Sequence, residues 1–204
     1  MEPKERILEK SHELFNKYGI RSVSMDDIAT QLGMSKKTLY QHFTDKEELV
    51  DGCFSGILEH HRCRCMADQK QAENSIQEMF LALDMMQEMF AEMNPAVLFD
   101  LQKYHPAAFK KFQEFKYNFL YGVISTNLQR GIKDELYRAE IDIDVLTRLR
   151  IESVMLPFNT DIFPNNRTHL VHIEQQIFEH FLFGLATSKG LKLIQKYKNQ
   201  RVKK

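Results

Sequence analysis

Apolar residues recur every three or four positions along almost the whole chain of 204 residues. The first apolar stripe consists of Ile7, Leu8, Leu14, Phe15 and Tyr18. It stops at a glycine, the residue type that commonly follows the C-terminus of a helix. No segment keeps the strict alternation of apolar and polar residues that marks a β-strand. The pattern therefore predicts an all-α fold.

Three short helices are predicted in the first fifty residues, and a long helix follows them. Ser24 and Ser35 each precede a short helical pattern, and serine is a favoured residue at a helix N-cap. The second of these patterns ends at Phe43, and either Thr44 or Asp45 is placed to cap the long helix that comes next. Two short capped helices joined by a glycine-containing turn are typical of a helix-turn-helix.

A polar stretch at residues 67–74 suggests where the chain changes organisation. We expect an N-terminal three-helix domain over residues 1–50, a connecting helix over about 45–66, and a larger helical bundle over 67–204. No internal repeat is visible.

Prolines and charge divide the second half of the chain. Pro95 and Pro106 are placed to begin two helices, and Pro157 to end a later one. A last long helix is expected from about Thr168. From Lys189 onward the chain is basic and carries no acid, which predicts either a solvated terminus or a contact with an anionic surface.

Composition narrows the class of protein without naming it. Gly and Pro are scarce, as expected for long helices, and three cysteines do not make a disulfide framework. No signal peptide or membrane-spanning run is recognisable, so we expect a cytoplasmic protein. The formal net charge is zero, and the first fifty residues are not basic. Any affinity for DNA must therefore depend on where the charges lie.

The segment from Ser24 to Phe43 carries the chemistry expected of a DNA-binding element. The second helix of such a motif enters the major groove with its N-terminus leading. Lysines and free backbone N–H groups there suit phosphates and base acceptors. The candidate DNA-binding residues are Ser24, Ser35, Lys36, Lys37, Thr38, Tyr40, His42 and Lys46. The same pattern also fits three packed helices with a few surface lysines.

A wider set of residues resembles a known family. The run comprises Ile7-Leu8, Leu14-Phe15, Tyr18-Gly19, Ser24-Met25, Ile28-Ala29, Leu32-Gly33-Met34-Ser35, Thr38-Leu39-Tyr40, His42-Phe43 and Asp45-Lys46-Glu47-Glu48-Leu49. Over residues 6–50 this chain resembles the N-terminal domain of TetR-type transcriptional regulators. Ser11 and Lys37 depart from the family pattern, which commonly has alanine at the first position and a small residue at the second.

The resemblance implies a homodimer that binds an inverted-repeat operator, more often as a repressor than as an activator. Two-fold symmetry of the protein then matches two-fold symmetry of the DNA. It further implies that the last two long helices, roughly 143–156 and 168–188, pack against their copies in the partner. The candidate interface residues are Ile177, Phe178, Phe181, Leu182 and Leu185.

The resemblance also implies a small-molecule effector held among the central helices. Methionine and phenylalanine make adaptable apolar walls, so a hydrophobic or aromatic effector is expected. The candidate lining residues, each of which could equally be ordinary core, are Met86, Phe90, Phe99, Tyr104, Phe112, Phe115, Phe119 and Met155. No cofactor or metal is expected. A helical ligand carrier that acts through a protein partner is the alternative function.

One further cluster, His60-His61-Arg62-Cys63-Arg64-Cys65, leaves three interpretations open. It could be an ordinary surface, a redox-sensitive site or a metal site. His61 and Cys65 share a helical face and are suitable zinc ligands, whereas the arginines disfavour a cation and should lower the pKa of a thiol. No motif of an enzyme is present, so we expect no catalysis.

Overall fold

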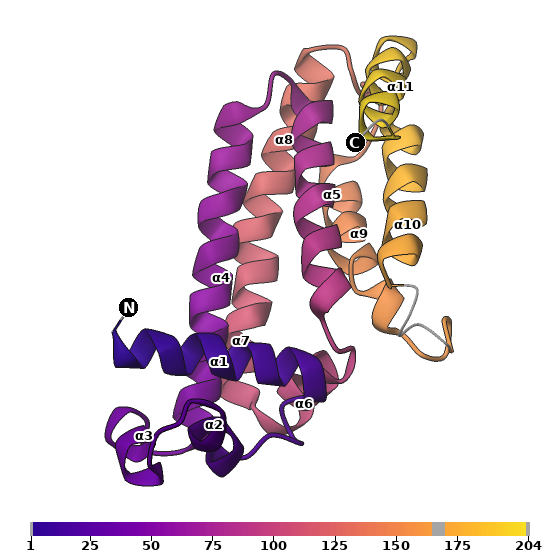
Figure 1. Ribbon diagram of the computed structural model, residues 1–204. Coiled ribbons are helices and arrows are strands. Elements are labelled where there is room, and N and C mark those ends of the chain that lie inside the picture. Colours follow the sequence, from indigo (N-terminus) through magenta and orange to yellow (C-terminus); the bar gives the residue numbers. More distant parts are fainter. Residues whose placement is uncertain (1, 165–169, 203–204) are drawn as a thin grey trace. The chain divides into compact units, whose positions relative to one another are not determined.

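The computed structural model describes residues 2–164 and 170–202, which form helices joined by short connections (Figure 1). The first half contains α1 (Pro3–Tyr18), α2 (Met25–Gln31), α3 (Lys36–His42), α4 (Lys46–Gln71), α5 (Ser75–Glu92) and α6 (Ala96–Tyr104). The second half contains α7 (Pro106–Glu114), a π-helical turn η1 (Phe115–Leu120), α8 (Tyr121–Lys133), α9 (Ile143–Ser153), a 3-10 turn η2 (Leu156–Phe158), α10 (Leu170–Leu185) and α11 (Ser188–Val202).

The all-α prediction is confirmed. Across the described ranges no strand forms, and one isolated antiparallel bridge joins Tyr137 and Ala186. None of the helices in these ranges is both long enough and apolar enough to cross a membrane. The predicted start of the last long helix at Thr168 lies outside the described residues.

The predicted helix caps are present in the first fifty residues. Ser24 accepts a hydrogen bond from the backbone N–H of Asp27, and Ser35 accepts one from that of Thr38. Of the two candidates for the fourth helix, Asp45 is the cap, because its carboxylate accepts from the backbone N–H of Glu48 at 2.8 Å. These bonds satisfy N–H groups that have no partner within their helix.

The first compact unit contains the chain up to His61 together with Glu92–Phe115. Its apolar core draws residues from α1 to α4 and from α6 and α7. The most deeply buried members are Ile7, Phe15, Ile20, Ile28, Ala29, Leu39, Phe43, Leu49, Val50, Val97, Leu101 and Ala108. The helix-turn-helix segment therefore shares one core with α6 and α7. That residues 1–50 bind DNA and residues 67–204 bind a ligand and form the dimer remains a prediction.

The second compact unit contains Arg62–Ala91 and the chain from Lys116 onward. Its core combines α5 with α8, α10 and α11, and α8 also packs against α9. The buried members are Ile76, Met79, Phe80, Leu83, Leu128, Leu136, Tyr137, Phe178, Phe181, Leu182, Leu185, Ile194 and Tyr197. Gly131 has to be glycine here, because a Cβ at this position would lie 2.0 Å from the ring of Tyr137.

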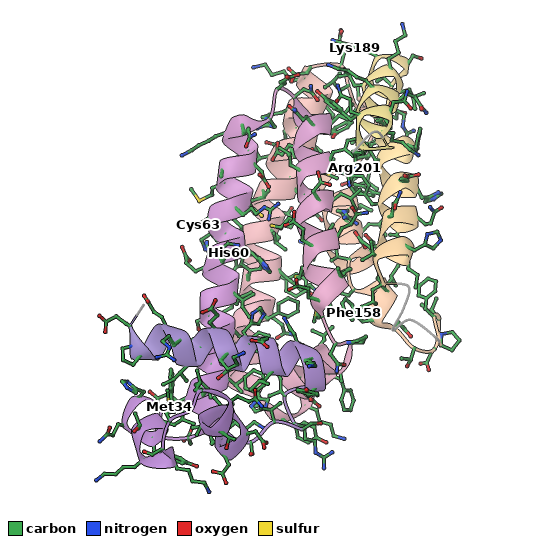
Figure 2. The ribbon with its side chains drawn as sticks, viewed as in Figure 1. Met34, His60, Cys63, Phe158, Lys189 and Arg201 are labelled. Carbon is green, nitrogen blue, oxygen red and sulfur yellow. The ribbon has the colours of Figure 1, made fainter. Side chains whose placement is uncertain are left out.

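The basic C-terminal segment is an ordered helix rather than a solvated terminus as far as Val202. Ile194 is fully buried and Tyr197 is 6% exposed in the core of the second unit. Arg201, labelled in Figure 2, donates to the backbone oxygen of Phe80 and pairs with Asp84. The sequence-based expectation gave weight to the lysines and missed the apolar stripe between them. Lys203 and Lys204 lie outside the described residues.

A buried ion pair connects α9 and α10 inside the second unit. Arg150 Nη2 donates to Glu174 Oε1 at 2.7 Å, and the two side chains are 4% and 0% exposed. The guanidinium also lies over the rings of Phe178 and Phe181 and donates from Nη1 to Ser153. Burial raises the pKa of Glu174, although the neighbouring guanidinium acts in the opposite direction.

Removal of one member of this pair should strongly destabilise the fold. We expect Arg150→Ala to lower the free energy of unfolding by about 3–5 kcal/mol, because it leaves the Glu174 carboxylate buried and unpaired. Urea denaturation followed by circular dichroism measures the change. Arg148→Ala is the matched control, since Arg148 pairs with Asp144 on the exposed side of the same helix and should change little. Equal effects of the two variants would contradict the prediction.

Candidate DNA-binding site

The N-terminus of α3 presents two adjacent lysines to solvent. Ser35 caps the helix, and its Oγ lies 2.8 Å from Oγ1 of Thr38. Leu39 and Phe43 are buried on the opposite side, at 0% and 2% exposure. Because these two side chains fix the rotation of α3 about its axis, Lys36 and Lys37 lie on its exposed face.

The two lysines differ in their electrostatic environment. Lys36 forms an ion pair with Asp26 on α2, and the hydrogen bond to that carboxylate raises its pKa. Within the described part of the chain, Lys37 has no acidic partner at all. Lys37 is therefore available to an external anion without loss of an existing contact, whereas Lys36 would have to exchange Asp26 for it.

Ser24 and Asp27 form a closed pair at the start of α2. The Ser24 hydroxyl donates to Asp27 Oδ2 at 2.6 Å and accepts from the Asp27 backbone N–H at 3.2 Å. Hydrogen bonds from the Ser24 side chain and backbone hold the pKa of Asp27 below its usual value. The hydroxyl thus serves the helix cap, and a DNA contact by Ser24 would have to replace its bond to Asp27.

The remaining predicted contacts flank α3. Tyr40 is 47% exposed and His42 is half-buried at the end of the helix. Lys46, at the start of α4, donates from Nζ to the backbone oxygen of Ile20 at 2.7 Å. Desolvation by burial lowers its pKa. The structure thus brings the eight predicted residues to the starts of α2 and α4 and along α3, and gives Lys46 a structural bond that the sequence did not indicate.

One contact between distant segments holds the linker between α1 and α2. The carboxylate of Asp100, on α6, accepts a hydrogen bond from the backbone N–H of Arg21 at 2.9 Å. A Cβ on Gly19, whose φ is +83°, would lie 3.3 Å from the same carboxylate oxygen. Asp100 is 6% exposed. Sequence analysis missed this residue, because nothing local marks a partner 79 positions away.

The candidate effector residues of the first unit differ in exposure. Phe99 is 57% exposed and Tyr104 is 36% exposed on α6, so in this chain neither is the buried wall that was expected. Phe112 packs on the core that contains the helix-turn-helix, and Phe115 is buried. Their spacing was correctly interpreted as helical, but the pattern does not say which side of α6 faces solvent.

The candidates of the second unit lie among buried polar groups. Met86 is buried, and its sulfur lies 3.8 Å from Arg150 Nη2. Phe90 packs edge-to-face on Phe158 with 5.0 Å between the ring centroids. Phe119 lies under a guanidinium, and Met155 precedes η2 with partial exposure. Whether these side chains bind an effector remains a prediction.

The candidate dimer residues are mostly interior. Phe178, Leu182 and Leu185 are at most 1% exposed, and Phe181 is 8% exposed. Only Ile177 is partly exposed. The first four contact the chain's own core, so they do not offer the exposed surface that an interface requires. An interface along α10 would have to use the side of the helix opposite these residues. The apolar pattern alone does not distinguish a side that faces the core from a side that faces a partner.

The cysteine–histidine cluster does not have the geometry of a metal centre. No group of three metal-ligating side chains occurs in residues 2–164 and 170–202. Cys63 is exposed and points outward from α4 in Figure 2, whereas Cys65 is buried. Burial raises the pKa of Cys65 to about 11, and Arg64 has only a weak opposing effect. The arginines were expected to lower the pKa of a thiol; at Cys65 the effect of burial outweighs that of Arg64, whose guanidinium pairs with Glu88 on α5.

Comparison with known proteins identifies the N-terminal element. Residues 7–53 match the model of bacterial regulatory proteins of the tetR family. The matched residues include all of the helix-turn-helix and the start of α4. Over these residues, about a quarter of its length, the chain matches the TetR family of transcriptional regulators. Members of this family are regulators rather than enzymes, in agreement with the sequence-based expectation.

Related proteins extend the similarity over most of the chain. An HTH-type transcriptional regulator of Staphylococcus aureus strain bovine RF122 is 25% identical over 195 residues, which cover 91% of this chain and 92% of the relative. A TetR regulator from Chloroflexus aurantiacus has a TM-score of 0.71 at 20% identity, covering 91% and 96% of the two chains. The regulator FadR from Bacillus subtilis, solved in complex with stearoyl-CoA, has a TM-score of 0.66 at 16% identity, covering 89% and 98%. At such identities these two structures establish the shared fold alone.

The three cysteines should differ in their rate of alkylation. We expect iodoacetamide at neutral pH to modify Cys63 first, because burial raises the pKa of Cys65 to about 11 and that of Cys53 to about 12. Peptide mass spectrometry over time measures the three rates, and the same reaction in urea is the control that exposes all three thiols. Modification of Cys65 as fast as Cys63 in the folded protein would contradict the expectation.

Proposed function

We propose that this regulator binds an inverted-repeat operator as a homodimer and that a small, hydrophobic effector changes its affinity for that operator. The observation that carries the DNA-binding part is the capped, seven-residue helix α3 with exposed Lys36 and Lys37. A short capped helix with leading cations is the form that enters a major groove. We expect the protein to act in the cytoplasm and to repress transcription when it is bound to its operator.

The chain has no net charge, but the placement of the charged residues around α3 supports DNA binding. Acids near the site are held by internal partners: Asp26 pairs with Lys36, and Asp27 is bonded to Ser24. The first turn of α3 contains no acid, so Lys37 faces the solvent without a negative neighbour in that turn. This arrangement suits phosphate despite the balanced overall charge.

The interior of the second unit supports an effector with an apolar body and a polar group. Met86, Phe90 and Phe158 provide apolar surface beside the Arg150–Glu174 pair. Two acceptor atoms there, Glu174 Oε2 and Thr147 Oγ1, are buried without a hydrogen-bond partner. A ligand donor could satisfy them, and an unpaired buried acceptor is otherwise costly. A structural relative, the Bacillus subtilis regulator FadR, was solved with stearoyl-CoA, a ligand that also combines an apolar chain with polar groups.

The outward side of α9 supports association with a second copy. Val145 and Leu149 are 56% and 52% exposed and lie one helical turn apart. Exposed apolar side chains at this spacing are expected to be covered in a dimer. An effector can change operator affinity only if it binds one arrangement of this dimer better than another.

Operator binding should depend on Lys37 more than on Lys36. We expect the purified protein to bind its upstream DNA tightly in a salt-sensitive manner. Lys37→Ala should reduce the slope of log affinity against log salt by about one. Lys36→Ala should have a smaller effect, because Lys36 is already paired with Asp26 and would have to exchange that partner for a phosphate. Fluorescence anisotropy with labelled fragments at several salt concentrations measures both, and Lys110→Ala, on α7, is the control. Weak, salt-independent binding by the unchanged protein would favour a ligand carrier.

A charge on the outward side of α9 should prevent dimer formation. We expect Leu149→Glu to give a monomer in size-exclusion chromatography with light scattering, because it places carboxylates in the apolar contact. Glu152→Gln, on the same helix and also exposed, is the control that should remain dimeric. If the Leu149→Glu variant still elutes as a dimer, the interface does not lie on this side of α9.

A further inference from the structure

Arg21 and Tyr104 meet at the surface of the first unit, although 83 positions separate them. Arg21 Nη1 donates to the Tyr104 hydroxyl oxygen at 3.1 Å, and the guanidinium carbon lies 5.1 Å from the centre of the tyrosine ring. Both side chains are exposed. The tyrosine therefore orients the guanidinium from two directions, by a hydrogen bond and by a cation–π contact.

Neither side chain is neutralised by this contact. In the described ranges, the Arg21 guanidinium has no carboxylate partner. The Tyr104 hydroxyl accepts the hydrogen bond from Arg21, so its own hydrogen is available to another acceptor. The pair thus offers one positive charge and several donors to solvent. That combination matches the geometry of a phosphate oxygen pair.

The linker places this pair between two residues that are expected at the DNA. Arg21 stands three positions before Ser24, the cap of α2, and directly after Ile20, whose backbone oxygen bonds Lys46 at the start of α4. The backbone of Arg21 is held by Asp100. The peptide group between Ile20 and Arg21 is thereby held at both ends, its carbonyl by Lys46 of α4 and its N–H by Asp100 of α6. The position of the guanidinium is consequently determined by the fold and not by a mobile loop.

The acid below the linker does not cancel the positive charge of the pair. Asp100 is 6% exposed, and its Oδ2 is occupied by the Arg21 backbone N–H. The negative charge of the Asp100 carboxylate also interacts with the ammonium of Lys46 and partly offsets the lowering of the pKa of Lys46 by burial. Arg21 and Tyr104 remain the outward-facing groups.

We infer that Arg21 and Tyr104 form a phosphate-binding site for the DNA backbone, outside the helix-turn-helix, to which α6 contributes the tyrosine. This inference rests on the proposed DNA binding. Backbone contacts of this kind set affinity and register and carry no base preference. Because Tyr104 and Asp100 are both on α6, the position of α6 determines whether the site is complete.

The test compares Arg21→Gln and Tyr104→Phe with the unchanged protein. Fluorescence anisotropy measures affinity for the upstream DNA fragment and for a mixed-sequence duplex at several salt concentrations. Arg21→Gln should lower the slope of log affinity against log salt by about one and the affinity at 0.15 M salt by about fivefold. Tyr104→Phe keeps the ring and removes the hydroxyl, so it should weaken binding by about two- to fivefold without changing the slope. Neither variant should alter the ranking of operator base substitutions.

Matched controls separate phosphate binding from a structural role. Lys110→Gln removes an exposed cation from α7 in the same unit, and Tyr117→Phe removes the hydroxyl of an exposed tyrosine elsewhere. Both should leave binding unchanged. A slope unaltered by Arg21→Gln would overturn the inference, as would a weaker affinity that is accompanied by a lower melting temperature and an unchanged slope. Failure of the unchanged protein to bind any duplex would instead overturn the proposed DNA binding, and the inference with it.

Discussion

The burial of Leu39 and Phe43 in one apolar core sets the position of every group that is expected to meet DNA. The same core contains Val97 and Leu101 of α6, so the helix-turn-helix and α6 form a single packed body. Removing these side chains from water is the dominant favourable contribution to such packing. Because this packing fixes which side of α3 and of the α1–α2 linker is buried, it also determines which side is exposed.

Electrostatics in this regulator depend on local pairing and not on overall charge. The acids nearest to α3 are occupied by Lys36 and Ser24, which leaves Lys37 and the first turn of α3 facing outward. The linker repeats this pattern, since Asp100 is buried below Arg21 while the guanidinium remains exposed. A neutral chain can in this way present a positive surface at the place where it binds an anion.

The second unit contains more buried polar groups than an apolar core needs. The Arg150–Glu174 pair is buried, as are Glu78 and Asn127, and the partly exposed Arg130 pairs with Glu78. Buried charges add little net stability compared with apolar replacements of the same shape. These buried polar groups are therefore better explained by a role in selecting a ligand or a single packing arrangement than by a contribution to stability.

The sequence by itself determined the helical class, the caps at Ser24 and Ser35, and the family to which the first fifty residues belong. Those features depend on residues within a few positions of one another, and helical periodicity and capping make such relations visible. Only the tertiary structure decided that Phe178 and Leu182 are core, that Phe99 is exposed, and that α11 buries Ile194 and Tyr197. It also brought Tyr104 to Arg21 and Asp100 to the linker. An amphipathic pattern shows that one side of a helix is covered, but the covering segment lies far away in the chain and is chosen by packing.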